Sequence, residues 1–452
     1  MGREIFEGSQ NLRERIISST PRTSNTEMPM TVAYLWPTKY CPIGCEHCMF
    51  ASPDLSEVDR QMVLSENAVS RFIEISKKSR LESLVVSGGG EPTLEMNTIE
   101  RLIKEAHFNY FEVITGAQWT ASDRLIHKYL GRFQDAISQR RLVGDRFDFS
   151  LRVSIDTFHQ AVVKPEWIGN LVKILRADSA NNLEVRKYPD ISLFFRTLLV
   201  DGENTADILA KHLGADITEM KDYVREIVFK DSKPGQINKL LVFYKDMRFV
   251  GRARGIENIK KSVEFEDYFA NYSKKEGDVR LGMSYLKPGS KGEVLKGINV
   301  FVSYDGKMMI YGGAPDLTLN VNLESNYNEY VLRLVRDVIS RTLLFKGLRH
   351  VEEIAEEVDP DVKNRVEKKN WLASVADESL ATPELRLYVT IRLLQGEVEN
   401  GELKIDDFPR WLSELIKIPK EILVEEYKKH TSDKPATHFM YGNEKVDTVK
   451  SV

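Results

Sequence analysis

The strongest constraint on the fold is a regular alternation of short apolar and longer amphipathic segments between residues 31 and 255. Apolar stretches such as TVAYLWP, LESLVVSGGGEP and the region over residues 237–254 predict strands. Amphipathic stretches such as residues 65–78 predict the helices between them. Ser65 is expected to cap one helix and Pro165 to begin another. About five or six such units in succession favour an α/β fold built on a parallel sheet.

The rest of the chain differs in character. After residue 255 we expect a β-hairpin that turns at Asp305-Gly306 and then mainly helices, one of them beginning at Thr382 and Pro383. The predicted regions are an N-terminal arm over 1–30, the sheet-and-helix region over 31–255, a hairpin region over 256–330, a helical region over 331–435 and a polar tail over 436–452.

Composition excludes several classes of function. The net charge of −4 and the pI of about 6.2 give no basic footprint for nucleic acid. The apolar runs are too short to span a bilayer, and the charged N-terminus lacks the apolar core of a secretory signal. A cytoplasmic protein with no membrane partner is therefore the expectation.

All three cysteines of the chain, Cys41, Cys45 and Cys48, lie in one loop after a predicted strand. A disulfide framework needs pairs, so metal ligation is the better interpretation. Zinc is one alternative, with His47 as a fourth ligand, although His47 directly precedes Cys48. An iron–sulfur cluster is the other: structural clusters normally take four cysteines, so three would leave one iron open to an exogenous ligand. The remaining alternative is that the three cysteines lie close together by chance and bind no metal.

A second motif follows the next predicted strand, where Gly88, Gly89 and Gly90 precede Glu91. Glycines allow the backbone to approach a ligand closely, and Glu91 suits a cationic group; the alternative is a plain turn between strand and helix. Further polar residues end the following strands, namely Thr115, Gln118, Ser154, Asp156 and Arg196. Since carboxyl ends of parallel strands meet on one rim, we expect these motifs to converge.

At these two motifs the sequence resembles the radical S-adenosylmethionine (SAM) superfamily, over about residues 31–255. The resemblance implies a partial (β/α)6 barrel and a [4Fe-4S] cluster on Cys41, Cys45 and Cys48. It implies that SAM chelates the open iron and is cleaved reductively to a 5′-deoxyadenosyl radical, which abstracts a substrate hydrogen. An external flavodoxin or ferredoxin would supply the electron.

The resemblance also implies a set of cofactor contacts. The segment from Gly88 to Glu91 would hold the amino group of SAM, while Ser154 and Arg196 would contact its carboxylate or ribose. Asp156, Thr115 and Gln118 are further candidates for ribose or substrate. Family members often carry an aromatic residue before the third cysteine, where this chain has His47. Catalytic residues stay undetermined, with four candidates: His159, Arg252, Tyr304 and Tyr311.

The hairpin region is similar to the SPASM or twitch extensions of peptide- and sugar-modifying members, but it carries no cysteine for an auxiliary cluster. Without such a cluster or a further thiol, two-electron oxidation and thiol-dependent epimerisation are disfavoured. A redox-neutral elimination, rearrangement or C–C cleavage is the expected reaction.

The substrate is less constrained than the cofactor. We predict modification of a ribosomally made precursor peptide, of the splicease type, with a small peptide-recognition protein as a further partner. The alternative enzyme is a lyase or dehydratase acting on an aminoglycoside or a nucleotide sugar. A zinc-stabilised binding protein without catalysis is the alternative from another class.

Overall fold

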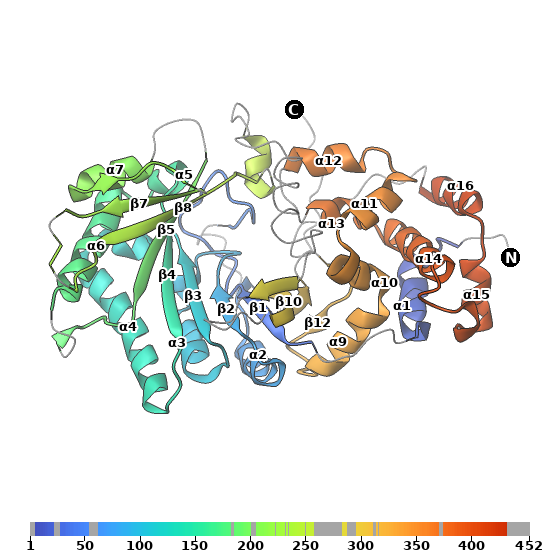
Figure 1. Ribbon diagram of the computed structural model, residues 1–452, viewed down its shortest axis with the longest axis horizontal. Coiled ribbons are helices and arrows are strands. Elements are labelled where there is room, and N and C mark those ends of the chain that lie inside the picture. The colour runs from blue at the N-terminus through green and yellow to red at the C-terminus, as the bar shows by residue number, and fades with distance from the viewer. Residues whose placement is uncertain are drawn as a thin grey trace.

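The computed structural model describes residues 5–21, 28–53, 62–181, 185–199, 205–221, 223–230, 232–233, 235–248, 250–256, 283–286, 295–310, 313–314, 316–369 and 374–431. Its two main parts lie side by side in Figure 1. A twisted sheet with helices on its outer face occupies the left of the view, and a group of C-terminal helices occupies the right.

Within residues 30–245, six strands of the sheet run parallel, in the spatial order β1-β2-β3-β4-β5-β8. Their bounds are Met30–Leu35 (β1), Ser83–Val86 (β2), Tyr110–Thr115 (β3), Asp148–Ser154 (β4), Ser192–Leu198 (β5) and Lys239–Lys245 (β8). Beyond β8 the sheet continues into two antiparallel strands, Val224–Val228 (β7) and Asp216–Ile217 (β6), so it does not close. The protein thus has the expected α/β fold with an open, partial barrel.

Helices connect consecutive parallel strands and cover the outer face of the sheet (Figure 1). They are Glu66–Ser79 (α2), Met96–Glu105 (α3), Asp123–Leu142 (α4), Thr157–Gln160 (α5), Pro165–Ser179 (α6) and Thr205–Leu213 (α7), with the 3-10 turns Pro92–Glu95 (η3) and Gln118–Ala121 (η4). The predicted cap is confirmed, since the Ser65 hydroxyl accepts a hydrogen bond from the amide of Ala68. Pro165 begins α6 as predicted.

The sixth parallel strand is shorter than the sequence suggested. The sequence led us to expect strand structure over residues 237–254, but β8 ends at Lys245, and Gly251–Gly255 form a 3-10 helix, η6. Gly251 has φ of +61°, and a Cβ there would lie 2.4 Å from the carbonyl oxygen of Met49. This close approach turns the chain back onto the cysteine loop, which is incompatible with a continuing strand.

The hairpin region joins the main sheet. Strands β10 (Leu295–Val302) and β11 (Lys307–Ile310) are antiparallel around the predicted Asp305-Gly306 turn. However, β10 also pairs parallel with β1, so the hairpin extends the barrel sheet instead of standing apart from it. The buried apolar residues Ile298, Val300, Phe301 and Val302 explain this, because a strand buried on both faces needs sheet neighbours and covering layers. The short strands Met283–Leu286 (β9) and Leu319–Asn320 (β12) complete this edge.

The C-terminal part is helical, as expected, and has its own apolar core. Its elements are Tyr327–Arg336 (α9), Val338–Arg341 (α10), Thr342–Lys346 (the π-helix η8), Arg349–Glu356 (α11), Val362–Lys369 (α12), Ser374–Ser379 (α13), Pro383–Glu399 (α14), Ile405–Asp407 (η9), Arg410–Ile416 (α15) and Lys420–Thr431 (α16). Thr382 caps α14 and Pro383 begins it, which confirms the prediction. Among the described residues, no helix combines the length and the apolar character that a membrane crossing requires.

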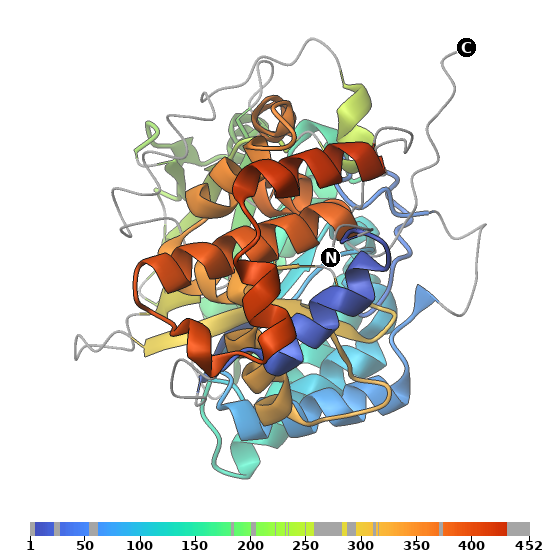
Figure 2. The same cartoon turned by 90° about the vertical axis from the view of Figure 1, so that its right-hand side faces the viewer.

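The N-terminal segment contributes a packed helix. Within the predicted arm, Ser9–Ser19 form α1, which lies against α14 and α9 and crosses the front of the molecule in Figure 2. Ile16 joins the core of the C-terminal helices, whereas Ile17 joins the core of the sheet. Helix α1 therefore links the two cores.

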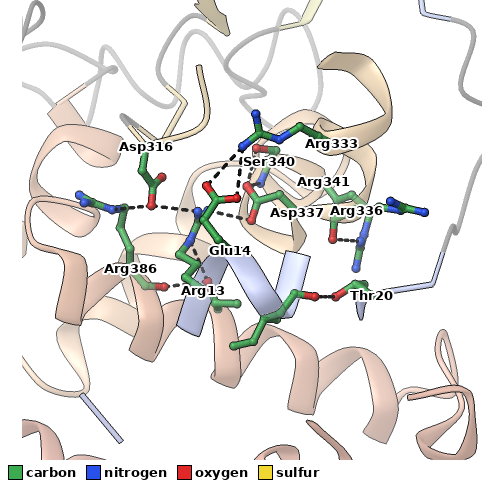
Figure 3. Close-up of polar contacts among 12 residues, drawn as sticks. Arg13, Glu14, Thr20, Asp316, Arg333, Arg336, Asp337, Ser340, Arg341 and Arg386 are labelled. Atoms are coloured by element: carbon green, nitrogen blue, oxygen red, sulfur yellow. Dashed lines mark hydrogen bonds and ion pairs between the residues drawn. The ribbon is translucent and has the colours of Figure 1, made fainter. Parts of the chain in front are cut away.

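A buried ionic network fixes α1 in place (Figure 3). The Arg13 guanidinium donates to Asp337 Oδ1 at 2.8 Å and to Asp316 Oδ2 at 3.0 Å. Arg386 of α14 also donates to Asp316, and the Ser340 amide and hydroxyl donate to Asp337. Each carboxylate thus accepts at least one charged hydrogen bond from an arginine that is distant in sequence.

We expect Arg13→Met to lower the free energy of unfolding by about 3–5 kcal/mol, because it leaves the fully buried Asp337 carboxylate without its cation. The neighbouring pair between Glu14 and Arg333 is about one third exposed, so the control Glu14→Gln should cost only about 0–1 kcal/mol. Chemical denaturation followed by circular dichroism measures both. If both variants lost an equal and small free energy of unfolding, the proposed contribution of the buried network to stability would be wrong.

Candidate active site

A cavity of about 580 Å³ opens beside the ends of the parallel strands. Most residues singled out in the sequence line it: Cys41, Cys45, Cys48, Gly88, Gly89, Gly90, Glu91, Thr115, Ser154, Asp156, His159, Arg196 and Arg252. Gln118 lies in η4 and does not line the cavity. Tyr304 lies beside Gly89 and Lys39 but is also absent from the lining, and Tyr311 falls outside the described residues.

The three cysteines lie on the loop that follows β1 and carry free thiols. The loop folds on itself, since the Cys48 amide donates to the Cys45 carbonyl at 3.1 Å and the Cys41 amide donates to the Pro53 carbonyl at 3.1 Å. Burial, followed by the nearby Glu91 carboxylate, raises the pKa of the Cys41 thiol to about 12. Such a thiol is protonated at neutral pH unless a bound metal ion displaces its proton.

Arg252 lies in η6, after the last parallel strand, and its side chain holds the cysteine loop. Its Nε donates to the Cys45 carbonyl at 3.0 Å, and one terminal nitrogen donates to the Ser52 carbonyl at 2.9 Å. Its backbone amide donates to the Cys48 carbonyl at 2.9 Å. Arg252 also lines the cavity, and its second terminal nitrogen has no hydrogen-bond partner in the described structure. Its candidacy for contacting substrate therefore stays a prediction.

The glycine loop after β2 packs directly against the cysteine loop. A Cβ on Gly90 would lie 1.9 Å from the Tyr40 carbonyl oxygen, so only glycine fits there. The Glu91 amide donates to the same carbonyl at 2.6 Å. The Ser52 hydroxyl donates to the Gly89 carbonyl. At Gly90, therefore, the glycine serves the contact between the two loops.

The Glu91 carboxylate is buried and accepts hydrogen bonds from neighbouring residues of the rim. Oε1 accepts from the Thr115 hydroxyl at 2.7 Å and from Thr93, and Oε2 accepts from the Gly116 amide at 2.9 Å. Glu91 thereby joins the end of β2 to the end of β3. The expectation that it also receives a cationic group stays a prediction.

Two histidines and Asp156 form a compact cluster beside Cys45. Asp156 caps α5 and accepts from His159 Nδ1 at 2.7 Å, and His47 stacks on Phe158 with ring centroids 4.6 Å apart. Burial opposes charge on His159, but Asp156 raises its pKa well above the usual value. In turn, despite burial, His159 holds the pKa of Asp156 at about 2. Burial lowers the pKa of His47 to about 4.

This cluster bears on the zinc alternative. Ligand atoms of Cys45, His47 and His159 all lie within 4.8 Å of one another. Sequence reasoning did not connect His159 with this site, because His159 is more than one hundred residues away along the chain and only the fold brings it close. The zinc alternative thus gains a specific ligand set to be tested.

Ser154 and Arg196 lie side by side, since they are register partners in the β4–β5 pair. Sequence reasoning missed other charged residues of the same wall, namely Glu112, Arg152, Lys245, Asp246 and Arg248. A signal was present, because Glu112, Arg152 and Arg196 interrupt otherwise apolar strands of a sheet whose faces should both be buried. A charged residue at an inward position of such a strand indicates a polar cavity.

Comparisons with known proteins add little to this geometry. No family model matches the chain, and no curated protein matches it. Among solved structures, "Native anSMEcpe with bound AdoMet" is 12% identical with a TM-score of 0.35, covering 81% of this chain and 99% of that one. Coproporphyrinogen III oxidase (HemN) from Escherichia coli, described as a radical SAM enzyme, is 13% identical with a TM-score of 0.31, covering 83% and 92%. TM-scores and identities this low carry no argument about function.

We expect Arg252→Met to loosen the cysteine loop, because two carbonyls lose a charged donor. Amide hydrogen exchange of residues 41–53 should accelerate roughly ten- to hundredfold, the equivalent of one or two lost charged hydrogen bonds. Arg101→Met, which removes an exposed ion pair on α3, is the control and should leave this loop unchanged. Unaltered exchange in Arg252→Met would show that other contacts hold the loop.

Proposed function

We propose that this protein is a radical SAM enzyme, with a [4Fe-4S] cluster on Cys41, Cys45 and Cys48. The observation that carries the proposal is that every thiol of the chain lines one cavity, at the point where the glycine loop packs against the cysteine loop. Neither motif alone would suffice. Together they combine soft metal ligands with close backbone approach in one cavity.

The donor set fits an iron–sulfur cluster with one open iron. Thiolates are the ligands that such clusters take, and the three cysteines come from a single loop whose carbonyls are held by Arg252. The buried and half-buried sulfurs are shielded by packing against the apolar core, which suits a cluster that must be protected from water.

In this proposal the cofactors supply reductive cleavage of SAM and a 5′-deoxyadenosyl radical, and the chain supplies ligation, orientation and exclusion of water. The glycine loop offers backbone groups to the amino end of SAM. Arg196 suits its carboxylate because the guanidinium can bond both oxygens, with Ser154 beside it. Asp156 orients His159 toward Cys45.

For the reaction, we propose redox-neutral C–C cleavage or rearrangement of a ribosomal precursor peptide in the cytoplasm, with a flavodoxin or ferredoxin as electron donor. The basis is the absence of cysteines beyond the first three, which leaves no thiol for an auxiliary cluster or for hydrogen donation. A nucleotide sugar is the second candidate. The basic side chains Arg152, Arg196, Lys245 and Arg248 in the cavity favour its phosphates and disfavour a polycationic aminoglycoside.

We expect Cys45→Ala to abolish formation of 5′-deoxyadenosine from SAM and dithionite and to lower the iron retained after anaerobic reconstitution. His159→Gln is the informative comparison. It should keep its iron if the three thiolates hold a cluster, whereas a zinc site on Cys45, His47 and His159 would lose its metal in both variants. Turnover that persists in Cys45→Ala would show that the ligand assignment is wrong.

The single-cluster proposal predicts about four irons per reconstituted chain. Iron and acid-labile sulfide are quantified beside zinc in the same samples. About eight irons would indicate an auxiliary cluster and would reopen oxidative chemistry, while stoichiometric zinc without iron would favour the binding protein.

A further inference from the structure

The cavity wall contributed by β4, β5 and the end of β8 is strongly basic. Arg152, Arg196, Lys245 and Arg248, here called the basic wall, all line the cavity. They belong to the half of the sheet that lies away from β1 and β2, whose loops carry the cysteines and the glycines. The lining therefore has a second region, chemically distinct from the thiol region.

Only part of this positive charge is compensated by acidic residues of the lining. Glu112 forms an ion pair with Arg152 at 3.1 Å and accepts from the Tyr110 hydroxyl at 3.0 Å. Arg152 Nε is buried and has no hydrogen-bond partner. Asp246 follows Lys245 in the chain and favours its charged form. The other two carboxylates of the lining, Glu91 and Asp156, accept hydrogen bonds from Thr115 and Gly116 and from His159.

At Arg196 and Lys245 the neighbouring cations act more strongly than the carboxylates Glu112 and Asp246. No side-chain hydrogen bond or ion pair is recorded for Arg196 or Lys245 within the described part of the chain, and both retain some accessible surface because they face the cavity. Burial, then Arg152 and Arg248, lowers the pKa of Arg196 to about 9. Burial, then Arg196, Arg248 and Arg152, lowers the pKa of Lys245 well below its usual value.

Such an arrangement is costly in the free protein. Cations that are desolvated and crowded by like charges destabilise one another, and a bound anion removes both penalties. The carboxylate of SAM could engage one member, Arg196, as proposed above. That single contact would leave Lys245 beside Arg152 and Arg248, whose effect on it exceeds that of Asp246, and would leave Arg152 Nε without a hydrogen-bond partner.

We propose that the basic wall binds an oxyanion of the substrate, a phosphate or a carboxylate, and so holds the substrate opposite the cysteine loop. This identifies the substrate as anionic and rests on the proposed function for the nature of the reaction. Lys245 is the principal contact, and Arg152 and Arg248 flank it. The guanidinium groups can bond two oxygens each, whereas Lys245 contributes a compact point charge.

The test is anion binding to the full-length, iron-reconstituted protein without SAM or reductant. Inorganic pyrophosphate and citrate serve as the phosphate and carboxylate probes, titrated calorimetrically at constant ionic strength. Lys245→Met should weaken binding of at least one probe roughly ten- to hundredfold, the effect of losing a charged hydrogen bond. Lys245→Arg should recover part of that loss.

Lys239→Met is the matched control, because it removes the same charge from the same strand at an exposed position paired with Glu226. It should alter the affinity by no more than about twofold. Thermal unfolding of each variant verifies its fold; should Lys245→Met not fold, Arg248→Gln gives the same test. Pyrophosphate binding alone indicates a phosphorylated substrate, and citrate binding alone indicates a carboxylic acid.

Absence of binding by both probes, or equal weakening in Lys239→Met and Lys245→Met, would overturn the inference. The outcome is separable from that of the proposed function, which is tested by release of 5′-deoxyadenosine from SAM. Anion binding without SAM cleavage would retain the basic wall and reject the radical enzyme. SAM cleavage without anion binding would retain the radical enzyme and reject the basic wall as an anion site.

Discussion

The contact between two loops is the constraint on which the candidate site depends. The Tyr40 carbonyl, just before Cys41, accepts the Glu91 amide and lies so close to Gly90 that no side chain fits there. This contact exists because β1 and β2 are parallel neighbours, so their carboxyl ends, and the loops that follow them, emerge at the same edge. The Glu91 carboxylate then carries the connection to β3 through Thr115 and Gly116. Three strand ends are thereby tied into one rim, and the cysteines take their position from it.

A second constraint comes from segments that are remote in sequence. Arg252 reaches the cysteine loop from beyond the last parallel strand, and Gly251 permits that approach. On the other side of β1, strand β10 extends the sheet, and α1 links it to the C-terminal helices through Arg13. Arg252 thus holds the cysteine loop, and Met49 of the same loop packs against the core of the C-terminal helices. The geometry of the loop therefore depends on remote segments as well as on the local motif.

The sequence was informative for features that depend on interactions between residues close together in the chain. The caps at Ser65 and Thr382, the prolines at helix starts and the Asp305-Gly306 turn each depend on a few neighbouring residues, and each is confirmed. The alternation of elements likewise predicted the α/β sheet, and the convergence of most candidate residues followed from it. What the sequence did not reveal is non-local. Pairing of β10 with β1, the buried partners of Arg13 and the meeting of His159 with Cys45 need contacts across 100 residues or more, which no periodicity encodes.

The cavity has two regions that ask for different ligands. Near β1 and β2, soft thiols and close backbone groups suit a metal centre and a small zwitterionic cofactor. Near β4, β5 and β8, the crowded basic side chains Arg196 and Lys245 suit an anion, while Arg152 is already paired with Glu112. The basic wall would attract the anionic group of a substrate. This attachment would leave the uncharged part of the substrate facing the thiols. Since a radical reaction selects a C–H bond by its position, a charged anchor on the opposite wall is a physically sufficient means of choosing that bond.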